Sequence, residues 1–235
     1  RTHSGRLDLE ARLRGAIERR DLVLHYQPIL DASSGEVVAA EALLRWEDGD
    51  RGLVAPDDFI AIAEETGLIV PLGRWVFLEA CEQLRRWRNA GLPPIRVGVN
   101  VSGHQIREPG MVDMVRSALE ETGVSPGQIE LEITESTIMQ DDVLTVRTLR
   151  EFKEMGIGLA LDDFGTGYSS MAKLAALTVD EMKIDRSLVT LIHERPRNQV
   201  ILRAIESLGS ALRMSIVAEG IETAAESAFL LHNTA

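Results

Sequence analysis

From residue 95 onward, short apolar segments alternate almost without exception with amphipathic segments, and this alternation most constrains the fold. The apolar segments have the length and composition of buried strands, whereas the others repeat apolar residues at helical spacing. Strands separated by helices pair in parallel through right-handed crossovers. The expected strands are Leu22–Pro28, Val37–Trp46, Ile95–Ser102, Ile129–Thr134, Gly158–Asp163, Glu181–Asp185 and Ser215–Gly220. The expected helices are Pro56–Thr66, Pro71–Ala90, Met111–Thr122, Asp141–Met155, Ser169–Ala176, Asn198–Leu212 and Thr223–His232.

The segment DASSGE between the first two strands predicts a hairpin, so that one antiparallel pair opens an otherwise parallel sheet. Seven strands are one fewer than a closed eight-stranded barrel needs. We therefore predict an α/β fold, a TIM-like (β/α)8 barrel with one antiparallel strand and with the eighth strand absent from this chain. Residues 1–20 are expected to form a connector helix and residues 21–235 the barrel domain.

Composition restricts the partners. The net charge of −12 over 235 residues argues against binding a DNA or RNA polymer or a polybasic contact with a membrane. No uninterrupted apolar run is long enough to cross a bilayer. A single cysteine, Cys81, cannot form an intrachain disulfide, which is typical of a reducing compartment. A small anionic ligand remains compatible with this composition if cations are supplied locally.

Polar side chains recur near the carboxyl ends of six expected strands, on the face that alternation allows to point into the barrel. They are Glu41, Asn100, Glu132, Asp162, Lys183 and Glu219, with Asp163 next to Asp162. Buried carboxylates are costly unless they are paired or bound to metal. Carboxylate and amide oxygens without thiolates suit Mg²⁺ or Mn²⁺, and two such ions form a common site for phosphoryl displacement.

Seven motifs in order make the chain resemble the EAL domain family of cyclic di-GMP phosphodiesterases. Glu41-Ala42-Leu43 is the signature tripeptide. The others are YQPI (26–29), NVS (100–102), ELEITES (130–136), DDFGTGYSS (162–170), KIDRS (183–187) and AEGIET (218–223). The resemblance implies hydrolysis of cyclic di-GMP to linear pGpG with two Mg²⁺ or Mn²⁺ ions, in the cytoplasm. It also implies fusion to an upstream sensory or GGDEF-type domain, and it leaves a homodimer open.

The resemblance also assigns roles to residues. Glu41, Asn100, Glu132 and Asp162 match metal ligands, while Asp163 and Glu219 match residues that serve the second ion. Lys183 matches the lysine that orients or deprotonates the attacking water, and Glu135 the glutamate that holds the DDFGTG loop. The positions matching substrate-contacting or site-shaping residues are Gln27, Glu41, Leu43, Arg45 and Glu222. The family's last, QGY-like strand and its glutamine are not found after residue 220.

Other interpretations remain for several of these residues. Glu135 and Glu222 are also typical acids at helix starts, and Arg45 could pair with a nearby carboxylate. A cyclic di-GMP receptor without hydrolysis is an alternative function. A third is a barrel lyase or aldolase in which Lys183 forms a Schiff base.

Overall fold

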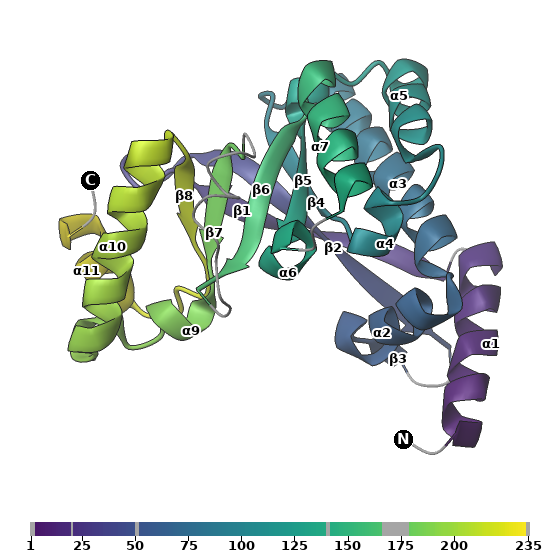
Figure 1. The fold of residues 1–235 in the computed structure, drawn as a ribbon, viewed down its shortest axis with the longest axis horizontal. Helices are drawn as coiled ribbons and strands as arrows, with labels where there is room; N and C mark the ends of the chain where they lie inside the picture. Colours follow the sequence, from purple (N-terminus) through teal and green to yellow (C-terminus); the bar gives the residue numbers. More distant parts are fainter. Residues whose placement is uncertain (1–2, 20, 50–51, 140–141, 166–178, 234–235) are drawn as a thin grey trace. The chain divides into compact units, whose positions relative to one another are not determined.

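The computed structural model describes residues 3–19, 21–49, 52–139, 142–165 and 179–233 (Figure 1). The described residues form two compact units. The first comprises Arg1–Ile29 with Val37–Ile129, and the second Leu30–Glu36 with Glu130–Ala235. The expected helix Ser169–Ala176 lies outside the described residues, as does most of the loop that follows Asp163.

Most expected elements of the first unit are present, with bounds within a few residues of the prediction. The short elements β3, α4 and η1 were not predicted. In chain order the elements are α1 (His3–Arg19), β1 (Leu22–Leu30), β2 (Val37–Asp48), β3 (Gly52–Val54), α2 (Pro56–Thr66), α3 (Ile69–Asn89), β4 (Arg96–Asn100), α4 (Gly103–Ile106), α5 (Met111–Thr122) and η1 (Pro126–Gln128).

The second unit continues the alternation of strand and helix. The short elements α6 and α9 follow strands and η2 follows α9; none of the three was predicted. The elements are β5 (Ile129–Thr134), α6 (Glu135–Met139), α7 (Val143–Met155), β6 (Gly158–Phe164), β7 (Glu181–Ile184), α9 (Arg186–Val189), η2 (Ile192–Glu194), α10 (Pro196–Leu212), β8 (Ser215–Ala218) and α11 (Ala224–Asn233).

Strand pairing within each unit follows the predicted pattern, except that the unpredicted β3 adds an antiparallel pair. In the first unit β2 lies between β1 and β4; β2 and β4 are parallel, and the short β3 pairs antiparallel with β2. The predicted hairpin is confirmed, because Asp31 N donates to Glu36 O at 2.9 Å and Gly35 has a φ of 72°. In the second unit β5, β6, β7 and β8 follow one another, and all pairs are parallel.

Helix ends follow the glycine signals in the sequence. Gly67, Gly123 and Gly156 adopt the left-handed conformation directly after α2, α5 and α7. A residue with a side chain is strained in this conformation, whereas glycine adopts it freely, so glycine ends a helix at little cost.

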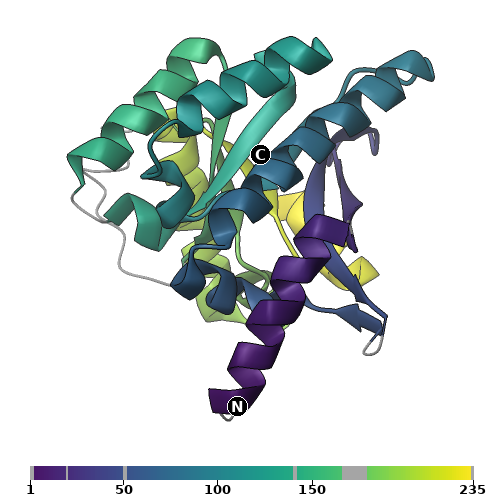
Figure 2. The same cartoon turned by 90° about the vertical axis from the view of Figure 1, so that its right-hand side faces the viewer.

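Apolar side chains form the core of the first unit around α1 and α2. Leu9, Leu13 and Ala16 on one face of α1 are at most 1% exposed. They belong to a cluster with Trp46 and Phe59, whose rings meet edge to face at 5.7 Å. The helix α1 therefore packs on this unit rather than projecting from it, and Figure 2 shows it alongside α2.

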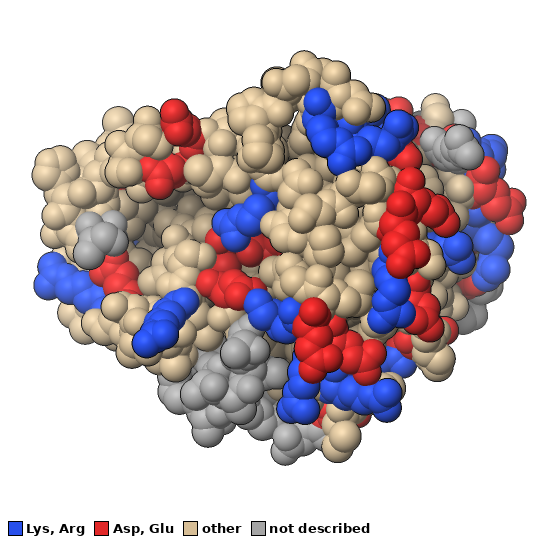
Figure 3. Space-filling view, turned by 90° about the horizontal axis from the view of Figure 1, so that it is seen from above, with Lys and Arg blue, Asp and Glu red and all other residues tan. Residues whose placement is uncertain are grey.

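Charged side chains of both signs are interspersed on the surface seen in Figure 3. In the part of the chain that the structure describes, no helix has the length and apolar character needed to cross a membrane.

Candidate functional site

Glu41 and Asn100 meet in the first unit. Glu41 on β2 pairs in register with Gly98 on β4, so alternation places Asn100, two residues further along, on the same face. Asn100 Nδ2 donates to Glu41 Oε1 at 2.8 Å. This contact confirms the predicted common face of the two side chains.

Three further predicted residues lie on β1 and β2 of the first unit. Leu43 follows Glu41 at period two on β2 and is half-buried, while Gln27 on β1 is exposed. Arg45 donates from Nη1 to the carbonyl of Leu44 at 2.8 Å. Among the described residues Arg45 forms no ion pair, so the predicted alternative of a carboxylate partner finds no support there.

Lys183 is the centre of the polar cluster in the second unit. Its side chain is 1% exposed, and Nζ donates to Glu132 Oε2 at 2.6 Å. Glu219 Oε1 lies 2.8 Å from Nζ and Asp162 Oδ1 lies 3.6 Å from it. Three of the predicted site residues are therefore brought together around the ammonium group of a fourth.

Strand register explains this convergence. Glu132 pairs with Ala160, Thr134 with Asp162, and Lys183 with Val217. Alternation then places Asp162 and Glu132 on one face of the sheet, as predicted. Because parallel strands end at the same edge, their last polar residues gather there.

The adjacent acids Asp162 and Asp163 lie in a β-bulge. Leu161 pairs with Met182 and Phe164 with Ile184, so β6 has one residue more than β7 between these pairs. Asp163 takes a left-handed conformation with a φ of 56°, and its N–H donates to Asp162 Oδ1 at 2.9 Å. The strand was predicted to break into a loop at Asp163; instead it continues to Phe164, and the bulge frees Asp163 from simple alternation.

Glu135 is the first residue of α6 and is 5% exposed. Its predicted position at a helix start is therefore confirmed. The neighbouring hydroxyl of Thr134 lies 3.0 Å from Ser136 Oγ and 3.1 Å from Thr137 Oγ1, which ties the strand end to this short helix. The loop that Glu135 is expected to hold lies mostly outside the described residues.

Glu222 and Thr223 lie between β8 and α11, where hydrogen bonds to Glu226 hold their backbone. Glu226 was not among the predicted site residues. Glu226 is 2% exposed, and its Oε2 accepts hydrogen bonds from the N–H groups of Glu222 and Thr223, both at 3.0 Å. Thr223 Oγ1 accepts from Glu226 N at 3.2 Å, which completes a capping box. The spacing Thr-x-x-Glu was the available signal in the sequence.

The donor chemistry of these clusters fits a hard divalent cation. Carboxylates and one amide supply oxygen donors, and Lys183 supplies the positive charge among the acids of the second unit. Among the described residues, no three or more His, Cys, Asp and Glu side chains are grouped so that they could hold a metal ion. The residue types, rather than their grouping in the described residues, are those that Mg²⁺ or Mn²⁺ prefers.

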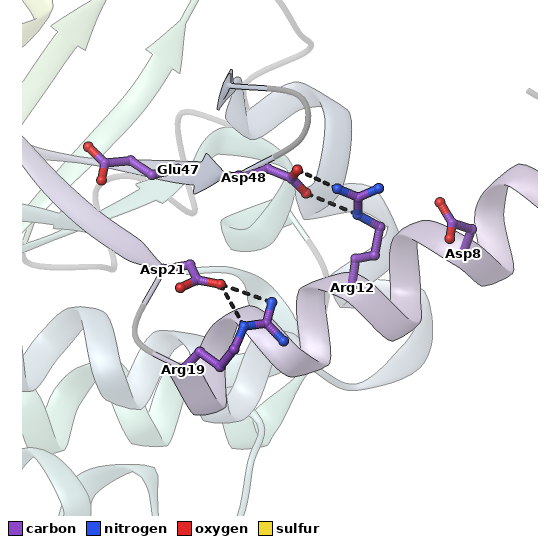
Figure 4. A pocket seen from close by; sticks show the side chains of 7 residues that line it. Asp8, Arg12, Arg19, Asp21, Glu47 and Asp48 are labelled. Atoms are coloured by element: carbon purple, nitrogen blue, oxygen red, sulfur yellow. Dashed lines mark hydrogen bonds and ion pairs between the residues drawn. The ribbon is translucent and has the colours of Figure 1, made fainter.

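A separate pocket in the first unit lies beside α1 (Figure 4). Asp8, Arg12, Arg19, Asp21, Glu47, Asp48 and Gly49 line it. Arg12 forms a bidentate pair with the buried Asp48, and Arg19 pairs with Asp21 at 2.9 Å. The first pair connects α1 to the end of β2, and the second connects it to the residue before β1. None of the predicted site residues lines this pocket.

Comparison with known proteins identifies similar chains. The family model described as "EAL domain" matches residues 10–234. The chain is 43% identical over 225 residues to "Cyclic di-GMP phosphodiesterase PdeR" of Escherichia coli (strain K12), covering 96% of this chain and 34% of that protein. It is 45% identical over 218 residues to "Bifunctional diguanylate cyclase/cyclic di-GMP phosphodiesterase MucR" of Pseudomonas aeruginosa, covering 93% and 32%. The chain thus spans about a third of the length of these curated relatives.

Solved structures agree with this likeness. The structure titled "PaMucR Phosphodiesterase, c-di-GMP complex" matches with a TM-score of 0.91 and 44% identity, covering 96% of this chain and 92% of that one. The cAMP- and cyclic-di-GMP-bound form of "EAL Enzyme Bd1971" matches with a TM-score of 0.93 and 29% identity, covering 100% and 64%. The predicted barrel class is confirmed, with seven barrel strands among the described residues besides β3 and no closing eighth strand among them.

Proposed function

This chain belongs to the EAL domain family, and we propose that it hydrolyses one phosphodiester bond of cyclic di-GMP to linear pGpG with two divalent ions, Mg²⁺ or Mn²⁺. The observation that carries the proposal is the cluster of the buried Lys183 and Glu132 with the partly exposed Glu219 and Asp162 at the strand ends of the second unit. Relatives named as cyclic di-GMP phosphodiesterases support the same substrate.

Two groups of oxygen donors would hold the ions. Glu41, Asn100, Glu132 and Asp162 would hold one, and Asp162 with Asp163 the other, with Glu219 acting through a water. When bound, such ions lower the pKa of water and neutralise charge on phosphoryl oxygens. Regular alternation would point Asp163 to the face of the sheet opposite to Asp162. The bulge interrupts this alternation, which supports the proposal that both aspartates serve the same ion.

Lys183 would orient the attacking water. Its Nζ carries three donors, and Glu132 and Glu219 hold the ammonium group in place at 2.6 and 2.8 Å. With so little of its side chain exposed, the lysine cannot swing into solvent. A donor held in this way positions a nucleophile without losing side-chain entropy during the reaction.

The remaining predicted residues would meet the nucleotide or shape its site. Arg45 suits a phosphate oxygen, because its fork-shaped donors match such an acceptor. Gln27 and Leu43 lie on the neighbouring strands of the first unit, and Glu222 lies on the loop after β8. Glu135 would support the site from the start of α6.

Incubation with cyclic di-GMP and Mn²⁺, followed by chromatography, tests the proposal. We expect pGpG to accumulate only when metal is present. Lys183→Ala should abolish hydrolysis while cyclic di-GMP binding stays within a few-fold of that of the unchanged protein. Undiminished turnover in Lys183→Ala would refute the role of the lysine, and nucleotide binding without pGpG in the unchanged protein would identify a receptor instead.

The wider setting stays a prediction. An upstream sensory or GGDEF-type domain, a homodimer, a cytoplasmic location and the division at residue 20 between connector helix and barrel are all expected from the sequence. The length of the curated relatives supports further domains in the parent protein.

A further inference from the structure

The loop between β8 and α11 is fixed at both of its ends. At its start, Glu219 N donates to Ile184 O at 3.2 Å, which joins it to the end of β7. At its end, Glu226 accepts from the N–H groups of Glu222 and Thr223. Only a few residues separate the two anchors, so the backbone that carries Glu219 has little freedom.

Glu226 also reaches the segment that follows β7. Its Oε1 accepts from Leu191 N at 2.8 Å. Leu191 has a φ of 55°, a conformation that costs energy for a residue with a Cβ and persists only where the surroundings hold it. A single buried carboxylate therefore joins the segment after Lys183 to the loop after Glu219.

Close backbone packing reinforces this link. Gly220 has a φ of 69°, and a Cβ at this position would overlap Cβ of Arg186 on α9. Asn198 on α10 donates to the carbonyls of Ser187 and Leu188 at 3.2 and 3.1 Å, which holds α9 from its other side. The segments that carry Lys183 and Glu219 are thus packed together as well as hydrogen-bonded.

We propose that Glu226 is a positioning residue that fixes the loop carrying Glu219 and so keeps Glu219 beside Lys183. Its effect on turnover rests on the proposed hydrolysis of cyclic di-GMP. The Glu226 carboxylate accepts hydrogen bonds from Leu191, Glu222 and Thr223, and it acts through the backbone of these residues. Hydrogen bonds from three N–H groups hold its carboxylate in the ionised form, and they lower its pKa to about 2.

The test compares Glu226→Ala and Glu226→Gln with a matched control, Asp31→Ala. Asp31 is also a carboxylate held by backbone N–H groups, those of Ser33 and Ser34 at 3.0 and 2.8 Å, but it lies in the turn before β2. This turn adjoins the amino end of β2, whereas the site residues lie toward the carboxyl ends of the strands. Removing the Asp31 carboxylate also deprives backbone N–H groups of an acceptor, but these two groups are exposed, whereas the three held by Glu226 are partly buried.

Steady-state hydrolysis of cyclic di-GMP at varied Mn²⁺ gives the first measurement. We expect Glu226→Ala to lower kcat at least tenfold and to raise the Mn²⁺ concentration needed for half the maximal rate, with KM changed less than threefold. Glu226→Gln should recover part of kcat, because its one amide oxygen can serve Leu191 or the Glu222–Thr223 pair but not both. A kcat for Glu226→Ala within twofold of the unchanged protein, or an equal loss in Asp31→Ala, would overturn the proposal.

Amide hydrogen exchange in metal-free protein gives a measurement that does not depend on turnover. The reporter is the N–H of Glu219, which bonds to Ile184 and not to Glu226. We expect Glu226→Ala to speed exchange at Glu219 at least tenfold, and Asp31→Ala to leave it unchanged. Faster exchange confined to Leu191, Glu222 and Thr223 would overturn the positioning role. If the unchanged protein makes no pGpG, the proposed function fails, and this exchange result still decides the role of Glu226.

Discussion

Replacing Lys183 by alanine should weaken the metal-free protein as well as stop hydrolysis. The substitution removes the ammonium group 2.6 Å from Glu132 Oε2, where both side chains are 1% exposed. It also removes the partner 2.8 Å from Glu219, but that carboxylate is 30% exposed and water can solvate it. The main cost therefore arises at Glu132.

The size of this cost follows from the geometry. At an effective dielectric constant of about 20, opposite unit charges at the separation of Lys183 and Glu132 attract by about 6 kcal/mol, before the cost of removing both from water is subtracted. Removing one partner of a buried ion pair typically costs about 3–5 kcal/mol. We expect the free energy of unfolding of Lys183→Ala to fall by about 3 kcal/mol in EDTA.

Urea unfolding in EDTA and in Mn²⁺, followed by circular dichroism, measures this effect. Because a bound cation would restore positive charge beside Glu132, the loss should shrink in Mn²⁺. Lys153→Ala is the matched control: its ammonium pairs with Asp180 at 2.5 Å, but the side chains are 25% and 41% exposed. That pair should contribute about 1 kcal/mol or less in either condition. Equal stability of Lys183→Ala and the unchanged protein in EDTA, or equal stabilisation of both by Mn²⁺, would refute the reasoning.

Two further predictions concern the loop after β8 and acid stability. Gly220→Ala should lower the free energy of unfolding by about 2–4 kcal/mol, because strain at a φ of 69° adds to overlap with Arg186. The control Gly35→Ala has a similar φ of 72°, but its new Cβ meets nothing within 4 Å, so it should cost about 1 kcal/mol. Equal losses of the two variants in thermal unfolding would contradict this prediction. The pKa of Glu226 is lowered from 4.5 to about 2 by hydrogen bonds from Leu191, Glu222 and Thr223, so the unfolded chain binds the extra proton first. The stabilisation that the ionised Glu226 gives to the folded protein is complete above about pH 4.5 and is lost as the pH falls toward 2. The urea midpoint of Glu226→Gln should therefore depend less on pH across this range than that of the unchanged protein. An equal pH dependence of the two midpoints would contradict the assignment.

Much of the fold could be predicted because its signals are local. The helix Pro56–Thr66 and the strand Ile129–Thr134 have the predicted bounds, since proline, glycine and apolar periodicity mark them directly. Short elements such as α9 were missed because four residues do not establish a period. They form because the chain must turn at a strand end, and capping residues such as Asp185, which accepts from Ser187 N at 3.0 Å, satisfy the backbone there.

The sequence by itself determined which side chains share a face, because alternation along a strand depends on nothing beyond the strand. On that basis alone it placed Glu132, Asp162 and Lys183 at one edge of a parallel sheet. Only the tertiary structure decided the bulge that turns Asp163, the pairing of Lys183 with Glu132 and Glu219, and the reach of Glu226 to Leu191. These features depend on the register between strands and on contacts between segments distant in the sequence, and no local pattern of residues encodes either one.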